Sequence, residues 1–318
     1  MTDNIIEIRG LTKHYDGVTA LEDLTLSVEE GAVVGFIGPN GAGKTTTMRI
    51  LTTLLQPTSG EAWVVGHEVT REPEQVRRAV GYMPDFFGVY EDMKVWEYLD
   101  FFAACYDIPP AVRDGMVDDL LALVDLGHKK EAFVDSLSRG MKQRLCLART
   151  LTHDPQVLIL DEPASGLDPR ARIEMRELLR ELKQMGKTIF FSSHILSEVA
   201  DVCTSIAILE AGRLVTYGDM EEMQKQLRAH RLVEVRVLGD LAPLQELLLR
   251  SEGVMTVVAG PEVELPPDTL RFDFAGDDAA LSRLLLQIVE AGVPVISFAE
   301  ETGNLEDVFL HATKGIVS

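Results

Sequence analysis

One glycine-rich segment constrains this chain more than any other feature, because it joins a short apolar run to a helical pattern. Residues 38–45 read GPNGAGKT and match the pattern G-x-x-x-x-G-K-[ST]. The apolar run at residues 32–37 is typical of a buried parallel strand, and residues 46–55 predict a helix. A strand, a glycine loop and a helix in this order present backbone N–H groups to a polyphosphate. We therefore expect an α/β fold with a phosphate site at this loop.

The residue types of this loop suit a nucleoside triphosphate held with Mg²⁺. The glycines let the backbone wrap the phosphates without Cβ collisions, Lys44 is expected to reach the β- and γ-phosphates, and the Thr45 hydroxyl to ligate Mg²⁺. The alternative is a glycine-rich turn that binds nothing, and the flanking strand and helix argue against it. The predicted phosphate-binding residues are Gly38, Pro39, Asn40, Gly41, Ala42, Gly43, Lys44, Thr45 and Thr46.

Two carboxylates follow a second apolar run. Residues 157–160 read VLIL, and Asp161 and Glu162 come directly after them. Open α/β sheets bind their ligands at the carboxyl ends of their strands. Asp161 therefore suits a role in holding Mg²⁺, and Glu162 suits the general base that polarises the attacking water. Taken alone, such a pair would more often be two solvated acids at a strand end, but the phosphate loop in the same chain favours the catalytic interpretation.

The pattern along the chain predicts two domains. Residues 1–220 alternate apolar runs with helical patterns and form an α/β core, into which residues 86–150 insert a helical subdomain. One helix is predicted to be capped by Asp168 and to end at Gly186. After a linker at residues 221–231, residues 232–318 predict a small α+β domain with the order β-α-β-β-α-β, which is ferredoxin-like. The apolar face of the Asp168-capped helix is assigned to Ile173, Leu178, Leu179, Leu182 and Met185.

Composition narrows the choice of partners. The net charge is −21 and the pI about 4.7, so a nucleic-acid partner is not expected. No signal peptide is apparent, and no run approaches the 18 or so apolar residues of a spanning helix, so a membrane role would require a separate polypeptide. Cys105, Cys146 and Cys203 form no CxxC pair and are expected to be buried free thiols in a reducing compartment.

Further motifs, in a fixed order, make residues 4–220 resemble the ATP-binding cassette (ABC) family. Residues 137–144 (LSRGMKQR) resemble the family signature, usually written LSGGQ, and residues 165–168 (SGLD) resemble the D-loop. His194 matches the switch histidine, and Tyr15 matches the aromatic residue that stacks on adenine. Each feature alone has an ordinary structural explanation, but their order and spacing are far more specific than any single motif.

The resemblance implies a mechanism that needs two copies of the chain. Two cassettes would close head to tail around two ATP molecules, so that Ser138 and Gly140 contact the γ-phosphate held by the other copy. Asp168 would shape the seam of this homodimer, and His194 would bind the γ-phosphate as a catalytic residue beside Glu162. Binding of ATP would close the dimer and hydrolysis would release it.

Two departures from the family pattern bear on turnover. Arg139 replaces the first glycine of the signature, and Met141 replaces its glutamine. Asp85 occupies the position of the Q-loop glutamine, where a carboxylate can still bind Mg²⁺ but adds a negative charge. We therefore expect Asp85 to contact both the nucleotide and Mg²⁺, and we do not assume the usual turnover of the family.

The last stretch indicates a branch of the family. Residues 303–314 resemble the ends of cassettes from prokaryotic drug, polysaccharide and sodium exporters, although they could equally form an ordinary amphipathic closing helix. The resemblance implies an ATPase on the inner face of the cell membrane that powers a separate transmembrane permease. The alternative is a soluble or regulatory cassette ATPase without a permease. The aromatic-rich stretch after Asp85, which includes Trp96, Tyr98, Leu99, Phe101, Phe102 and Tyr106, would form the groove for a permease helix, but the core of the subdomain is expected to bury most of these side chains.

Overall fold

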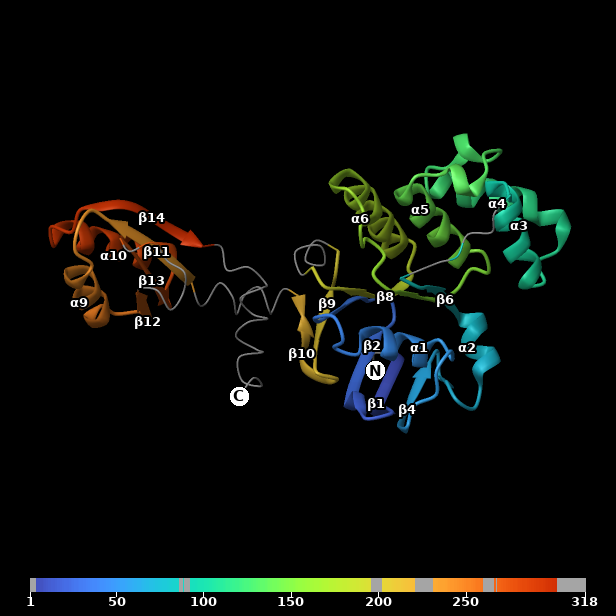
Figure 1. The fold of residues 1–318 in the computed structure, drawn as a ribbon, viewed down its shortest axis with the longest axis horizontal. Coiled ribbons are helices and arrows are strands. Elements are labelled where there is room, and N and C mark those ends of the chain that lie inside the picture. Colours follow the sequence, from blue (N-terminus) through green and yellow to red (C-terminus); the bar gives the residue numbers. More distant parts are fainter. Residues whose placement is uncertain are drawn as a thin grey trace. The chain divides into compact units, whose positions relative to one another are not determined.

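The protein forms two compact units, Met1–Met220 and Glu221–Ser318 (Figure 1). The structure is a computed structural model, and it describes residues 4–85, 88, 92–195, 202–220, 231–259, 266 and 268–301. Within these residues, no helix combines the length and the apolarity that crossing a bilayer requires.

The first unit is organised around a six-stranded sheet with the order β10-β9-β3-β8-β7-β6. All neighbouring pairs from β9 to β6 are parallel, and β10 runs antiparallel to β9. The apolar runs predicted as buried strands correspond to β3, β7 and β8, and all three strands are buried along their whole length. The strands are β3 (Val33–Ile37), β6 (Val80–Met83), β7 (Val157–Leu160), β8 (Thr188–Ser193), β9 (Ser205–Glu210) and β10 (Arg213–Asp219).

A second, antiparallel sheet with the order β2-β1-β4-β5 completes the core of this unit. Apolar side chains from this sheet and from β3 pack together with those of α1, and Phe36 meets Phe190 at a ring-centroid distance of 5.0 Å. This packing fixes α1 beneath the loop that precedes it. The elements are β1 (Asn4–Tyr15), β2 (Val18–Glu29), β4 (Ser59–Val64), β5 (His67–Glu68), α1 (Lys44–Leu51) and α2 (Pro73–Ala79).

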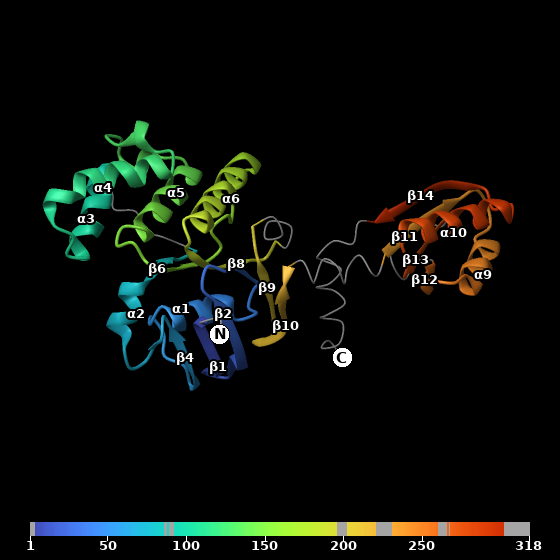
Figure 2. The same cartoon turned by 180° about the vertical axis from the view of Figure 1, so that it is seen from behind.

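Helices cover both sides of the six-stranded sheet. In both ribbon views, α5 and α6 lie on one side of β6 and β8, and α1 and α2 lie on the other (Figures 1 and 2). The segment between β6 and β7 is helical, as its sequence predicts, and its helices α3, α4 and α5 pack against one another. The elements are α3 (Val95–Cys105), α4 (Pro110–Leu123), the short 3-10 helices Gly127–Lys129 and Val134–Ser136, α5 (Arg139–Thr150) and α6 (Pro169–Gln184).

Helix α6 confirms the predicted caps but corrects the predicted face. Asp168 accepts a hydrogen bond from the Ala171 N–H, and Gly186 has a φ of 82° beyond the helix end. Ile173 and Met185, assigned to the buried face, are 51% and 58% exposed. Ile173 lies five residues before Leu178, which turns it about 140° away from that face, and Met185 lies past the last helical residue. The buried face is formed by Met175, Leu178, Leu179 and Leu182.

The aromatic stretch of α3 divides between core and surface. Tyr98 and Leu99 are buried, whereas Phe101 and Tyr106 are 42% and 40% exposed. The subdomain core therefore takes up only part of this stretch.

The three free thiols differ in exposure, because Cys146 and Cys203 are buried as expected but Cys105, at the end of α3, is exposed. The expectation of a buried Cys105 was wrong because this residue lies on the outer face of the helix.

The second unit is a four-stranded antiparallel sheet with the order β12-β13-β11-β14. Alternate residues of β11 (Val233, Val235 and Val237) pack with Leu248 of α9 and Ile288 of α10 in one core. The order of elements is the β-α-β-β-α-β expected from the sequence, and β11 already begins at Arg231. The helix predicted near residues 305–311 lies outside the described residues. The elements are β11 (Arg231–Val237), α9 (Ala242–Arg250), β12 (Val254–Ala259), β13 (Thr269–Phe274), α10 (Asp278–Glu290) and β14 (Val295–Glu301).

Candidate functional site

The ends of four neighbouring parallel strands bring the predicted site residues together. The phosphate loop follows β3, His194 follows β8, Asp161 and Glu162 follow β7, and Asp85 follows β6. Because these strands are parallel and adjacent, their carboxyl ends meet at one edge of the sheet. A cavity of about 350 Å³ opens there, lined by Ala20, Asn40, Gly41, Gly43, Lys44, Thr45, Thr46, Asp85, Glu162, Ser165 and His194.

Close packing explains two of the glycines in the phosphate loop. A Cβ at Gly38 would lie 2.2 Å from the carbonyl oxygen of Leu209, and a Cβ at Gly43 would lie 2.5 Å from that of Ala20. Gly43 also has a φ of 106°, which L side chains rarely adopt. Ala42 closes the loop by donating its N–H to Pro39 O at 3.1 Å. The loop is therefore held by β2 and β9 while its open side faces the cavity.

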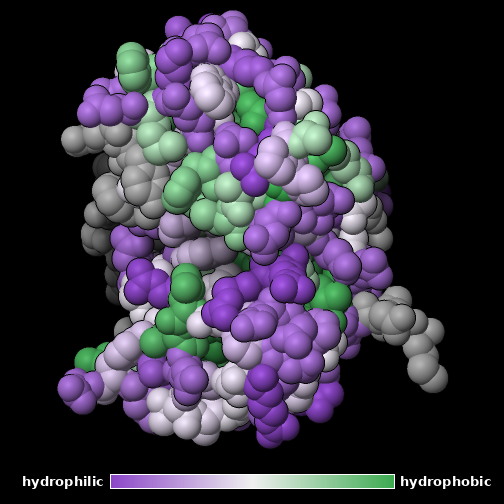
Figure 3. All heavy atoms as spheres, turned by 90° about the vertical axis from the view of Figure 1, so that its right-hand side faces the viewer, coloured by the Kyte–Doolittle hydropathy of each residue, from purple (hydrophilic) through white to green (hydrophobic). Residues whose placement is uncertain are grey.

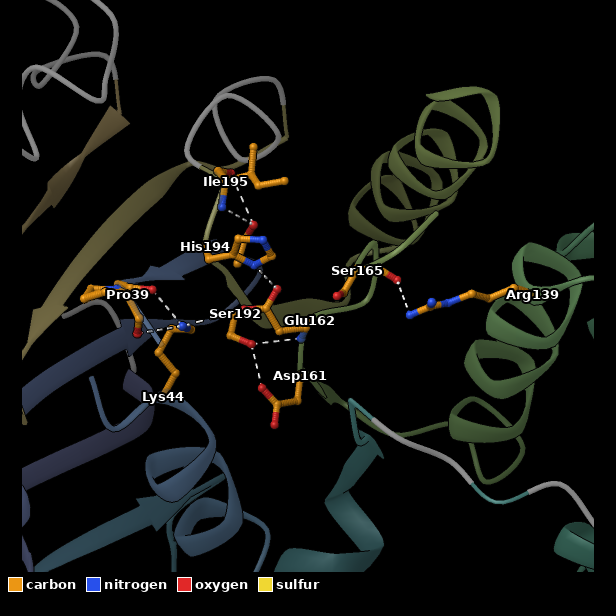
Figure 4. A network of polar contacts seen from close by, with 11 residues as sticks. Pro39, Lys44, Arg139, Asp161, Glu162, Ser165, Ser192, His194 and Ile195 are labelled. Carbon is orange, nitrogen blue, oxygen red and sulfur yellow. Dashed lines mark hydrogen bonds and ion pairs between the residues drawn. The ribbon is translucent and has the colours of Figure 1, made fainter. Parts of the chain in front are cut away.

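Lys44 begins α1 and is only 6% exposed. Its ammonium group donates hydrogen bonds to Gly38 O at 2.7 Å and to Pro39 O at 3.2 Å (Figure 4). The same nitrogen lies 3.6 Å from Oε1 of Glu162. A lysine held across the loop in this way places a fixed positive charge where the phosphates of a nucleotide would lie.

Asp161 is held by Ser192, a residue that was not among the predicted site residues. The Asp161 side chain is 1% exposed, and Oδ1 accepts a hydrogen bond from Ser192 Oγ at 2.7 Å. Ser192 Oγ in turn accepts the Glu162 N–H at 2.9 Å (Figure 4). Oδ2 of Asp161 is buried without a hydrogen-bond partner in the described part of the chain. A buried, unpaired carboxylate oxygen of this kind suits a cation ligand.

Glu162 lies between a lysine and a histidine. Its Oε2 forms a 2.8 Å bond with Nδ1 of His194, while Oε1 faces Lys44. Glu162 has a φ of 50°, and a non-glycine residue in the left-handed region costs about 1 kcal/mol or more. The side chain is 13% exposed, so a small opening connects it with the cavity. This backbone turn aims the carboxylate at the cavity rather than along the strand.

Asp85 enters a region that already holds two carboxylates. Burial of the carboxyl group raises the pKa of Asp85 above its usual value, and the negative charges of Asp161 and Glu162 raise this pKa further. Arg139 and His194 act in the opposite direction and lower this pKa. Asp85 lines the cavity, as expected for a residue at the Q-loop position.

Four predicted site residues belong neither to the phosphate loop nor to the strand ends around the cavity. Ser138 caps α5 by accepting the Met141 N–H at 3.3 Å, and Asp168 caps α6. Gly140 packs against α6, where a Cβ would lie 3.1 Å from Cβ of Ala171. Tyr15 is 45% exposed, and Lys13 Nζ lies 5.2 Å from the centroid of its ring. A single chain therefore brings the phosphate-loop and strand-end residues together, but not the signature residues, Asp168 or Tyr15.

Three residues at the site were not among the predicted site residues. Ser165 begins the D-loop segment and Ser192 lies two residues before His194, so position relative to the motifs could have suggested both as site residues. Ala20 lines the cavity through β2 and leaves no such signal, because its role depends on how the second sheet packs on the loop.

Comparisons with known proteins agree with this geometry. The ABC transporter family model matches residues 21–165. The Nod factor export ATP-binding protein I of Ralstonia nicotianae is 35% identical, over 97% of this chain and 94% of that protein. The daunorubicin resistance ATP-binding protein DrrA3 of Streptomyces coeruleorubidus is also 35% identical, over 98% and 97%. The bacitracin transport ATP-binding protein BcrA of Bacillus licheniformis is 32% identical, over 98% of each chain.

Solved structures give the same result. An ATP-binding subunit of an ABC transporter is 32% identical with a TM-score of 0.63, covering 70% of this chain and 93% of that one. CbiO1 of Clostridium perfringens, part of the ABC transporter complex CbiONQ, is 28% identical with a TM-score of 0.64, covering 71% and 94%. Together with the nearly full-length relatives, these matches show that the chain belongs to the ATP-binding cassette family of ABC transporters and is an ATPase of that family.

Proposed function

We propose that the chain binds Mg-ATP at the described cavity and hydrolyses it to power export through a separate transmembrane permease. The observation that carries this proposal is the convergence of Lys44, Glu162 and His194, from three different strand ends, on one cavity. A lysine, a carboxylate and a histidine around one space are the groups that phosphoryl transfer to water uses.

The phosphate loop supplies the binding half of the reaction. Residues of the loop and of the first turn of α1 line the cavity, so a polyphosphate there would meet their backbone N–H groups and the positive end of a helix. On binding, Lys44 would exchange its bonds with Gly38 O and Pro39 O for phosphate oxygens. The charge-assisted hydrogen bonds between the ammonium group and the phosphate oxygens would offset the two lost bonds. The ammonium group is already buried, so its own desolvation adds little cost.

The residues present fit Mg²⁺. Oδ2 of Asp161 is buried and unpaired within the described part of the chain, and Thr45 and Asp85 line the cavity together with the neighbouring Glu162. Among the described residues, no group of three or more His, Cys, Asp or Glu side chains could hold a metal by itself. This is the expected arrangement for Mg²⁺, which keeps several waters and takes substrate phosphates as ligands. When bound, Mg²⁺ would neutralise charge on the phosphates.

Glu162 is the proposed general base, and His194 orients it. The 2.8 Å bond to His194 Nδ1 fixes one carboxylate oxygen, and with a proton on both ring nitrogens the histidine would also donate from Nε2 to a γ-phosphate oxygen. Oε1 remains to accept a proton from a water in the cavity, once Lys44 has turned to the phosphates. The left-handed backbone at Glu162 directs its carboxylate toward the cavity, and His194 follows the end of β8.

The residues outside the cavity support a homodimer. Ser138, Gly140 and Asp168 lie at the amino ends of α5 and α6, away from the nucleotide loop of their own chain. In the head-to-tail dimer implied by the family signature, this end of α5 would face the γ-phosphate of the second copy, and Tyr15 would stack on adenine. Closure of the dimer around ATP and its opening after hydrolysis would then move the permease to which it is bound.

A surface cleft supports a permease partner. The cleft has a volume of about 850 Å³ and lies between α2, β6, α3 and the end of α5. Phe102 and Tyr106 line it together with Arg77, Arg78 and Arg149. Figure 3 views the side that carries α3 and α4, where apolar side chains (green) lie among hydrophilic ones (purple). An apolar cleft with a few charged groups is suited to an amphipathic helix of a partner.

The direction of transport and the location are proposed from the relatives. Two of the aligned relatives are named for Nod factor export and daunorubicin resistance, which favours an exporter. We place the chain at the inner face of the cell membrane, bound through its permease, with the second unit as an accessory domain. No nucleic-acid partner is proposed for so acidic a chain.

Glu162→Gln tests the catalytic assignment. The change keeps the shape of the side chain but removes the base, so we expect turnover to fall by about 10²–10⁴-fold with the Kd for ATP largely unchanged. Glu177→Gln on the exposed face of α6 is the matched control and should leave turnover unchanged. Wild-type turnover in Glu162→Gln would refute the assignment.

The same variant tests the partner. Purified from membranes in mild detergent with Mg-ATP, Glu162→Gln should trap the closed dimer together with a polytopic membrane protein. Recovery of a homodimer alone at every detergent strength would instead support a soluble or regulatory cassette ATPase.

A further inference from the structure

Arg139 connects the helical subdomain to the turn that follows the catalytic strand. The residue is the first of α5, and its Nη2 donates a hydrogen bond of 3.1 Å to the carbonyl oxygen of Ser165 (Figure 4). A glycine, which is usual at this position of the family signature, has no side chain to form this bond. The contact is therefore specific to chains that carry an arginine here.

The guanidinium group also lies against a glycine of the same turn. Gly166 has a φ of 66°, and a Cβ at this position would lie 2.3 Å from Cζ of Arg139. Only glycine leaves room for the planar group at this distance. An alanine at this position would displace the arginine, because the end of a long side chain moves more easily than backbone.

The turn held by Arg139 leads directly to the proposed base. Ser165 donates its N–H to Glu162 O at 3.0 Å, which closes the turn, and Ser165 also lines the nucleotide cavity. Glu162 keeps a left-handed backbone there, a conformation that persists only when its surroundings hold it. Ser192 holds the turn from the strand side and Arg139 from the helix side.

We propose that Arg139 is a positioning residue that anchors the turn from Glu162 to Gly166 and so keeps the Glu162 carboxylate between Lys44 and His194. Beside this contact α5 and α6 approach each other closely, because a Cβ at Gly140 would lie 3.1 Å from Cβ of Ala171. The proposal rests on the role of Glu162 proposed above, but it concerns the structure of one chain without nucleotide.

Hydrogen exchange of the nucleotide-free chain tests this role without turnover. The full-length protein is kept in EDTA without nucleotide, at a concentration where light scattering gives the mass of one chain. Arg139→Ala should speed exchange of the Ser165 amide by about tenfold, since the loss of a charged hydrogen bond loosens the turn. Arg139→Lys should give a smaller effect. Arg170→Ala, which removes a 90% exposed arginine from the first turn of α6, should give none.

Steady-state ATPase assays supply the second readout. Arg139→Ala should lower kcat by about three- to tenfold with KM for ATP unchanged, because the base is displaced but the phosphate loop is intact. Unchanged exchange with a lowered kcat would overturn the proposal and place the action of Arg139 on a second copy of the chain. Unchanged exchange and unchanged kcat would overturn it as well. Loss of activity in Glu162→Gln is measured separately, so the two assignments fail independently.

Gly166→Ala disturbs the contact between Arg139 and the turn by a change in the turn itself. Its methyl group should displace the guanidinium and speed exchange of the Ser165 amide, beyond the effect of its own backbone strain. In the Gly166→Ala background, removal of Arg139 should then add little. If removing Arg139 from the Gly166→Ala protein speeds exchange of the Ser165 amide about tenfold further, the proposal is overturned, and this comparison does not need the Arg139→Ala single variant.

Discussion

Replacing Ser192 with alanine would test the centre of the site, because one hydroxyl group there holds both carboxylates. Ser192 Oγ donates to Oδ1 of Asp161 at 2.7 Å and accepts the Glu162 N–H at 2.9 Å. Ser192 is fully buried and Asp161 is 1% exposed, so water cannot readily replace these bonds. Ser192→Ala would leave the Asp161 carboxylate without the protein hydrogen bond described for it.

The structure sets the size of the expected effect. A hydrogen bond to a charged group contributes about 1.5–3 kcal/mol, and an unpaired buried N–H costs about 1–3 kcal/mol. Because the two losses share one site and local relaxation recovers part of them, we expect the free energy of unfolding to fall by about 2–4 kcal/mol. If Asp161 binds Mg²⁺, Mg-ATP should reduce this deficit, since the cation would take over the unpaired oxygens.

Urea unfolding followed by tryptophan fluorescence measures this loss in the relevant unit. The two tryptophans, Trp63 and Trp96, both lie in the first unit, so the signal does not include the second. Ser193→Ala is the matched control, because Ser193 ends the same strand but bonds to Ile195. A loss below about 0.5 kcal/mol in Ser192→Ala, or one equal to that of the control, would refute the reasoning.

Two further predictions concern the rest of the molecule. Burial lowers the pKa of His153 below the usual 6.5, and its Nε2 bonds to Val80 O. The unfolded chain therefore protonates His153 at a higher pH than the folded chain, so the free energy of unfolding falls as the pH drops below 6.5. In urea titrations at several pH values, His153→Asn should make this fall smaller. An unchanged pH profile would contradict the prediction. In the second unit, Arg231 pairs with Glu300 and, at 2.8 Å, with Asp278. Arg231→Ala should lower the free energy of unfolding of this unit by about 1 kcal/mol, which hydrogen exchange would show as faster exchange in β11, and it should leave kcat unchanged. A change in kcat would show that this ion pairing also affects the ATPase.

The phosphate loop could be predicted because its signals are local. The pattern at residues 38–45 and the apolar run before it lie within one short segment, so no knowledge of the fold was needed. The same holds for the cap at Asp168 and for the alternation along β11, since helix and strand periods act over a few residues. Ile173 shows the limit, because one apolar residue can fall within a helical pattern and still face solvent.

The contacts of Ser192 and Arg139 could not be predicted in this way. Ser192 reaches Asp161 only because β8 lies between β3 and β7 in the sheet, although it follows both in the chain. Arg139 reaches Ser165 only because α5 packs beside the turn after β7. Both contacts join residues about thirty or fewer positions apart through the packing of whole elements, which no local pattern records.

The sequence by itself determined the class of fold, the glycine loop between a buried strand and a helix, and the two carboxylates at the end of an apolar strand, because motifs and periodicity are properties of short segments. Only the tertiary structure decided which strand ends meet, which oxygen of Asp161 is left unpaired and what holds Glu162 in its left-handed turn. These features depend on strand order and on side chains brought together by burial, and the free energy that selects them belongs to the packed core as a whole.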